Sequence, residues 1–92
     1  MSEVYRIVNI RDTEAKMTRV DGRYPMRIGR TCYKPEPIIG VPLIIGYIAN
    51  ADGSDYAGFF LRTSLVVNYL ESGNKLTVET MNSIYEFEKV ED

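Results

Sequence analysis

Clusters of turn-forming residues divide this chain into short apolar segments, and this division most restricts what the chain can fold into. Glycine, proline, asparagine and aspartate gather between the segments, as in the clusters Asp21-Gly22, Lys34–Pro37, Asn50–Asp55 and Glu71–Asn74. No window of about twelve residues has the 3.6-residue apolar period of an amphipathic helix. Lys75–Thr80 alternates instead between apolar and polar residues, which is the pattern of a half-buried strand. The sequence therefore predicts an all-β protein.

The predicted strands are short and mostly antiparallel, and they belong to one domain. The 92 residues leave no room for a second hydrophobic core. Six or seven strands are expected among the segments 3–11, 17–20, 23–34 (irregular or bulged), 41–49, 56–61, 65–70, 75–80 and 84–90, with a corner at 62–64. Closing the sheet removes the exposed edges that a short open sheet would leave. We expect a small single-domain barrel over residues 1–92, built from five to seven strands.

The composition excludes most kinds of catalytic site. The chain has no histidine, so a serine–histidine triad, a cysteine–histidine pair and histidine zinc ligands are ruled out. Cys32 is the only cysteine, which excludes an internal disulfide and predicts a reducing compartment. The glycines match neither the P-loop nor the dinucleotide-binding spacing. We expect a protein that is not an enzyme and that holds no cofactor and no metal.

Two groups of acidic residues fall short of what their chemistry would require. Glu86 and Glu88 share one strand face, but a carboxylate pair works as acid and base only in a cleft that shifts one pKa. Asn50, Asp52 and Asp55 lack the bidentate glutamate and the flanking helices of an EF-hand. Solvated strand side chains are expected for the first group, and a hairpin loop is expected for the second.

The apolar segments are too short to cross a bilayer. The longest, Ile38–Ala49, has 12 residues and is interrupted by two glycines and a proline. Charged residues appear from Glu3 onward, before any apolar stretch that could form a signal peptide. We expect a cytoplasmic protein without a membrane partner.

The charge is divided unevenly along the chain, although the formal net charge is only −2. Residues 1–34 hold eight lysines and arginines and four acids, whereas residues 35–92 hold three basic and nine acidic residues. Such a division can produce a face that attracts phosphates or an acidic partner. It can also vanish in the folded protein if strands from the two halves interleave and their charges mix. The sequence leaves both alternatives open.

The candidate binding residues are Arg23, Arg27, Arg30 and Lys34, in the basic part of the chain. Their spacing would align them on one face of a helix, but Pro25 and Gly29 oppose a helix here. On a regular strand Arg27 and Arg30 would face opposite sides, and a bulge at Gly29 would return them to one face. The alternatives are a basic stripe or solvated arginines that pair with acids of the C-terminal strands.

Several short stretches carry a resemblance to known proteins. They are Arg27–Arg30, Leu61–Val66, Gly73–Thr80 and Asn82–Phe87. Together they resemble small uncharacterised bacterial and phage-encoded β proteins that end in a Thr-x-Asn-Ser-x-Tyr pattern, here Thr80–Tyr85. The resemblance implies a compact SH3-like barrel without an established activity, and it transfers no catalytic residue.

These observations favour a non-catalytic protein-binding or adaptor module. Its partner surface is expected to include exposed tyrosine and arginine, or the apolar Ile38-Ile39 region if that is not covered. The alternative function is a nucleic-acid-binding barrel that uses the arginine-rich N-terminal half, although the net negative charge opposes it. We expect a monomer or a weak homodimer.

Overall fold

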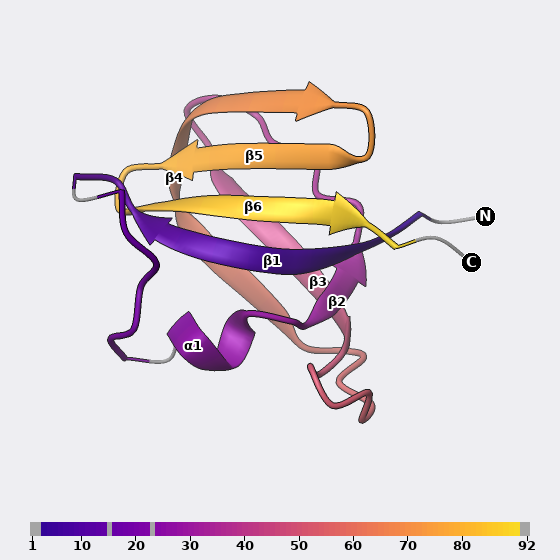
Figure 1. Cartoon of the computed structure of the whole chain (residues 1–92). Coiled ribbons are helices and arrows are strands. Elements are labelled where there is room, and N and C mark those ends of the chain that lie inside the picture. Colours follow the sequence, from indigo (N-terminus) through magenta and orange to yellow (C-terminus); the bar gives the residue numbers. More distant parts are fainter. Residues whose placement is uncertain (1–2, 15, 23, 91–92) are drawn as a thin grey trace.

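Six antiparallel strands close into a barrel, in agreement with the predicted all-β fold. The computed structural model describes residues 3–14, 16–22 and 24–90. Neighbouring strands pair in chain order, and pairing of the first strand with the last closes the barrel (Figure 1). The elements are β1 (Val4–Asp12), α1 (Tyr24–Arg27), β2 (Thr31–Tyr33), β3 (Pro42–Ala49), β4 (Phe60–Ser72), β5 (Lys75–Thr80) and β6 (Ser83–Lys89).

The core is built from inward-facing residues of every strand. In β1, Tyr5 and Ile7 point inward at a spacing of two, and a β-bulge between Ile7 and Asn9 then turns Ile10 inward as well. All three side chains are at most 2% exposed. The bulge explains why β1 lacks a strict alternation along its whole length.

The β5–β6 hairpin follows the predicted alternation. Leu76 and Val78 of β5 and Tyr85 and Phe87 of β6 are buried, and the two strands pair without a register shift. Thr80 closes the turn, because its hydroxyl donates to the Ser83 carbonyl at 3.0 Å and accepts from the Ser83 amide at 3.1 Å.

Three strand predictions need correction. Residues 17–20 form only an isolated bridge at Thr18, since this excursion lies outside the barrel and leaves Met17 and Val20 mostly exposed. The region after Arg23 begins with the helix α1 rather than with a strand. The predicted strand 56–61 starts only at Phe60, after a turn in which Gly58 adopts a positive φ of 91°.

Within the described residues, no helix is long and apolar enough to span a bilayer.

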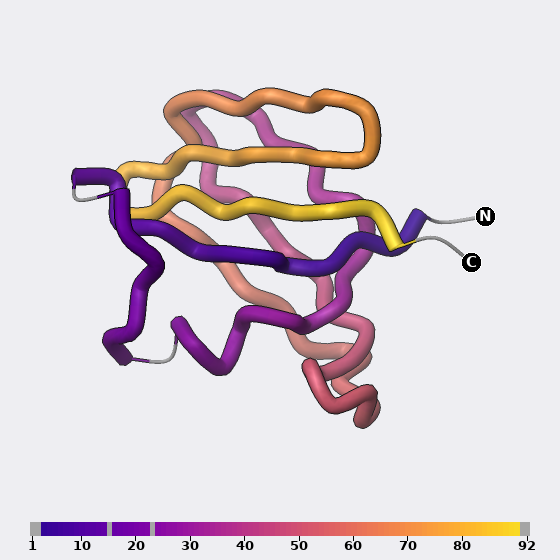
Figure 2. Tube along the Cα trace, in the orientation of Figure 1, coloured from indigo at the N-terminus to yellow at the C-terminus, as the bar shows by residue number. Residues whose placement is uncertain are grey.

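The long strand β4 changes partner along its length. Its first half, up to Leu65, pairs with β3, and its second half, from Val66, pairs with β5. The predicted corner at 62–64 lies inside this strand, just before the change of partner. Figure 2 shows the trace changing direction as it passes from the back of the barrel into the hairpin with β5. On the β5 side, the first half of β4 forms no ladder pairs and accepts one backbone hydrogen bond, from the Met81 amide to the Leu65 carbonyl at 3.0 Å, and side chains of α1 face it there.

Candidate anion-binding site

A short helix and a glycine turn bring Arg27 and Arg30 to the same place. Pro25 is tolerated because it lies in the first turn of α1, where its missing N–H is not needed. Gly29 has a φ of 94°, and its amide donates to the Ile7 carbonyl of β1 at 2.7 Å. A Cβ at position 29 would lie 2.8 Å from the Ala51 Cβ, so only glycine fits. The two arginines converge through this turn rather than through a bulged strand.

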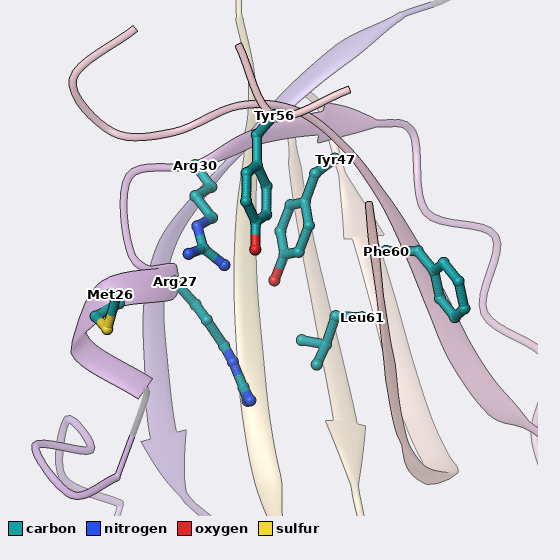
Figure 3. Close-up of a pocket in the computed structure, with 7 residues that line it drawn as sticks. All are labelled: Met26, Arg27, Arg30, Tyr47, Tyr56, Phe60 and Leu61. Atoms are coloured by element: carbon teal, nitrogen blue, oxygen red, sulfur yellow. The ribbon is translucent and has the colours of Figure 1, made fainter. Parts of the chain in front are cut away.

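Both arginines line a pocket of about 330 Å³ between α1, the end of β3 and the start of β4. The Arg30 guanidinium lies 4.4 Å from the centre of the Tyr56 ring and 4.9 Å from that of Tyr47 (Figure 3). Its Nε donates to the Asn50 Oδ1 at 3.1 Å. The pocket is lined by Met26, Arg27, Arg30, Tyr47, Tyr56, Phe60 and Leu61.

The charge in this pocket is not neutralised. Neither Arg27 nor Arg30 forms an ion pair with another described residue, and the described residues that line the pocket include no acid. A guanidinium offers several N–H donors in a planar fork that matches carboxylate or phosphate oxygens. The pocket can therefore accept an anion without first breaking a salt bridge.

Tyr47 supplies a neutral donor beside these charges. Its hydroxyl is buried and has no hydrogen-bond partner among the described residues. Burial raises the pKa of Tyr47 above its usual value, although the positive charge of Arg30 opposes this shift. The hydroxyl keeps its proton at neutral pH, and none of the described residues accepts that proton.

Exposed aromatic rings lie beside the pocket, where Phe60 lines it and Phe59 stacks on the lining residue Tyr56. Phe60 is 64% exposed and Phe59 is 60% exposed, and the Phe59 ring stacks on Tyr56 with centroids 4.6 Å apart. In Figure 3 the Phe60 ring points away from the arginines. Large aromatic rings left in solvent beside a charged pocket provide surfaces for stacking.

Of the other two candidate residues, Lys34 lies away from the pocket and Arg23 is not among the residues that the structure describes. The Lys34 Nζ pairs with Glu71 at 3.1 Å and with Glu3 at 3.6 Å, away from the pocket. Its hydrogen bond to Glu71 raises the pKa of Lys34. Arg23 lies outside the described residues. Of the four candidates, the structure thus brings Arg27 and Arg30 together and places Lys34 apart.

Salt bridges elsewhere join the two oppositely charged halves of the chain. Arg11 of β1 pairs with Glu86 of β6, and Glu3 pairs with Lys89 at 3.3 Å. Strands from the two halves lie side by side, so much of the charge division disappears on the folded surface. The Arg11–Glu86 salt bridge occupies the Glu86 carboxylate, so Glu86 does not form a cleft with Glu88.

Burial raises the pKa of the Cys32 thiol to about 12, which keeps it protonated.

Sequence reasoning missed the aromatic half of the pocket. Tyr47, Tyr56 and Phe60 were expected only as strand residues, because tyrosine and phenylalanine are common in strands. One available signal was their position, since Tyr47 and Tyr56 flank the turn cluster Asn50–Asp55 and face each other across it. That cluster forms a hydrogen-bonded loop, in which Asp52 accepts from the Ser54 amide at 2.9 Å.

No protein-family model, curated protein or solved structure matches the chain. The resemblance to small bacterial and phage β proteins, and the SH3-like type of barrel, therefore stay predictions. A function must be inferred from the pocket itself.

Proposed function

We propose that the protein is a non-catalytic binding module that holds single-stranded nucleic acid at the Arg27–Arg30 pocket. The observation that carries this proposal is a pair of arginines without acidic partners beside exposed aromatic rings. Guanidinium groups bind phosphates, while aromatic rings stack on bases of any sequence. The proposal develops the nucleic-acid alternative that the basic N-terminal half of the sequence suggested.

The shape and chemistry of the pocket favour a single strand over a duplex. A concave site of about 330 Å³ can take one nucleotide unit but not a double helix. Arg27 and Arg30 would bind a phosphate, the Tyr47 hydroxyl would donate to one of its oxygens, and a neighbouring base would stack at the rim. The negative net charge of the whole chain gives little long-range attraction, so we expect modest affinity with a marked dependence on salt.

Titration of a fluorescent oligothymidylate, followed by anisotropy, tests the proposal. The wild-type protein is expected to bind, and its affinity should fall steeply between about 50 mM and about 200 mM salt. A double Arg27→Ala, Arg30→Ala variant should lose about tenfold or more in affinity, and its salt dependence should become shallower.

The matched control is Arg6→Ala, which removes one positive charge from an exposed position on β1. Its affinity should stay within about twofold of wild type, since rim and distant charges act mainly through the general field. Absence of binding at low salt would refute the proposal. An equal loss in the Arg6 variant would show that net charge, and not the pocket, governs binding.

A protein-binding role is the second candidate, and a different surface favours it. Ile38 and Ile39 are 64% and 60% exposed, so the apolar region considered in the sequence is not covered. Ile44 and Leu65 on the paired strands β3 and β4 are also exposed, and Arg62 lies opposite Ile44 across these strands. This face suits a peptide that brings apolar side chains and an acidic group for Arg62.

A synthetic peptide of alternating leucine and glutamate tests this second role by NMR titration. Amide signals of Ile44, Arg62 and Leu65 are expected to shift. Shifts confined to Arg27 and Arg30 would contradict the protein-binding role, because they would place the peptide in the anion pocket. The expected cytoplasmic location and weak self-association stay predictions under either function.

A further inference from the structure

A second hollow adjoins the arginine pocket. It has a volume of about 230 Å³ and shares Arg27 and Leu61 with its neighbour. It lies between the first half of β4, whose ladder partner is β3, and the β5–β6 turn. Ser64, Thr80, Asn82 and Ser83 contribute polar groups to its wall, which therefore differs from the aromatic wall of the first pocket.

Two serine hydroxyls in this hollow have no hydrogen-bond partner. The Oγ atoms of Ser64 and Ser83 are buried, and Ser83 as a whole is 1% exposed, yet neither hydroxyl has a hydrogen-bond partner among the described residues. Burying a hydroxyl without a partner is unfavourable, so such groups in a folded protein call for an explanation. Both serines are among the residues that line the hollow.

The neighbouring threonines differ from the two serines, because the threonine hydroxyls do form hydrogen bonds. The Thr63 hydroxyl donates to the Ser64 carbonyl at 2.7 Å and accepts from the Leu43 amide at 3.0 Å. The Thr80 hydroxyl is likewise engaged, with both the carbonyl and the amide of Ser83. The threonine hydroxyls thus have hydrogen-bond partners within the protein, whereas the serine hydroxyls remain available to a ligand that enters the hollow.

The electrostatics of the hollow favour an anion. Arg27 stands between the two cavities, and no acidic residue is among the described residues that line the hollow. Burial raises the pKa of Tyr85, another lining residue, to about 12, so its phenol stays protonated as well. Hydroxyl donors beside a guanidinium match the oxygens of a phosphate group.

We propose that this serine-lined hollow is a second phosphate subsite, which holds the phosphate next to the one bound by Arg27 and Arg30. The inference rests on the proposed function. It adds that the protein binds two consecutive phosphates of one nucleic-acid strand. Arg27 contacts both cavities and so lies where two linked phosphates would share its charge. Ser64 and Ser83 donate to the second phosphate only.

Calorimetric titration with two nucleotides tests the subsite, using thymidine 5′-monophosphate and the 5′-phosphorylated thymidine dinucleotide. The wild-type protein should bind the dinucleotide about tenfold more tightly, because two hydrogen bonds to a charged group are added. A Ser64→Ala, Ser83→Ala double variant should reduce this ratio to about two while binding the mononucleotide as before. Arg30→Ala should weaken binding of both nucleotides.

Ser72→Ala is the matched control, because Ser72 is exposed at the far end of β4. It should preserve the full ratio. The double variant is expected to fold, with an unchanged or higher melting temperature, because the change removes unpaired buried hydroxyls. An unchanged ratio in a folded double variant overturns the subsite and leaves the proposed function intact.

The failure of both nucleotides to bind the wild-type protein would overturn the proposed function itself. The subsite then faces its own test, an NMR titration with inorganic phosphate. Shifts of the Ser64 and Ser83 amide signals, absent from the double variant, would support an anion site in the hollow. Unmoved signals would overturn it and assign the hydroxyls to bound water.

Discussion

Two groups of basic residues, both within residues 1–34, differ in whether they have acidic partners. The paired group, Arg11, Arg19 and Lys34, finds acidic partners on the folded surface. The pocket group, Arg27 and Arg30, instead lies against tyrosine rings, with no acid among the described residues nearby. Both groups are positively charged and come from the same basic part of the chain, so the fold rather than the composition decides the difference.

The position of each group follows from its backbone. Arg11 lies on β1, whose register against β6 places Glu86 within reach, and Lys34 directly follows β2. Strand pairing of this kind sets charges from distant parts of the chain side by side. Arg27 and Arg30 lie on a helix end and a glycine turn that stand outside the strand pairing. The charge of Arg11 is neutralised across the β1–β6 ladder, whereas Arg27 and Arg30, which lie beside the ladder, stay available to a ligand.

An acidic residue placed beside the pocket group should neutralise it as the paired group is neutralised. This change has the largest expected effect on binding. Met26 lines the pocket and is 64% exposed, so Met26→Glu would place a carboxylate beside both arginines without disturbing the core. Oligonucleotide affinity should fall by about tenfold or more, measured by anisotropy at low salt. Met17→Glu, at a 70% exposed position outside the pocket, adds the same charge and should change affinity little. Equal losses in the two variants would contradict a local site.

Removing one member of each group should separate stability from binding. The Arg19 side chain is 16% exposed, donates to the Asn82 carbonyl at 2.7 Å and lies 4.5 Å from the Tyr24 ring centre. Arg19→Ala should lower the free energy of unfolding by about 1–2 kcal/mol, measured with urea. Arg27→Ala should cost less, about 0.5 kcal/mol, since Arg27 has no ion pair among the described residues and contacts the partly exposed Tyr24 ring and the Tyr85 phenol. A larger loss for Arg27 would make it a structural residue.

Extremes of pH should weaken different parts of the molecule, and this is the smallest effect expected. A hydrogen bond from Lys89 lowers the pKa of Glu3, so its contribution to stability is present above the usual value of 4.5 and is lost as the pH falls through the lowered pKa. Burial raises the pKa of Tyr85 to about 12, so stability declines as the pH rises from the usual value of 10 toward 12.

Urea titrations across the pH range check both slopes. Glu3→Gln should flatten the acid decline, and Tyr85→Phe should flatten part of the alkaline one. The buried Cys32 thiol and the Tyr47 phenol contribute further alkaline parts, because burial raises the pKa of Cys32 from 9.0 to about 12 and also raises that of Tyr47. If Tyr85→Phe leaves the alkaline slope unchanged, the burial of that phenol does not control it.

Regular alternation made part of this structure predictable. The β5–β6 hairpin could be placed from sequence because its inward and outward residues alternate and its turns carry typical residues. Residues 17–20 were misassigned as a strand, since they pair with β1 only through a single bridge, between Thr18 and Arg11. The helix α1 was missed because four residues are too few to show a helical period.

The candidate site was predictable only in its charges. Arg27 and Arg30 could be singled out by composition, but their convergence depends on the turn at Gly29, which no period encodes. Tyr47 has the sequence pattern of an ordinary core residue. No sequence signal shows that the hydroxyls of Ser64 and Ser83 lack hydrogen-bond partners, because whether a hydroxyl finds a partner depends on residues from other strands.

The close approach of Gly29 to Ala51 provides a way to recognise relatives of this protein. The 2.8 Å that would separate the two Cβ atoms means that the residues at these positions must together stay small. One position ends the turn that aims Arg30, and the other lies in the loop beside Tyr56. Diverged chains that keep this pocket should retain a glycine and a small residue there, whatever happens to the rest of the barrel. This pair forms a compact signature with which distant sequences could be searched.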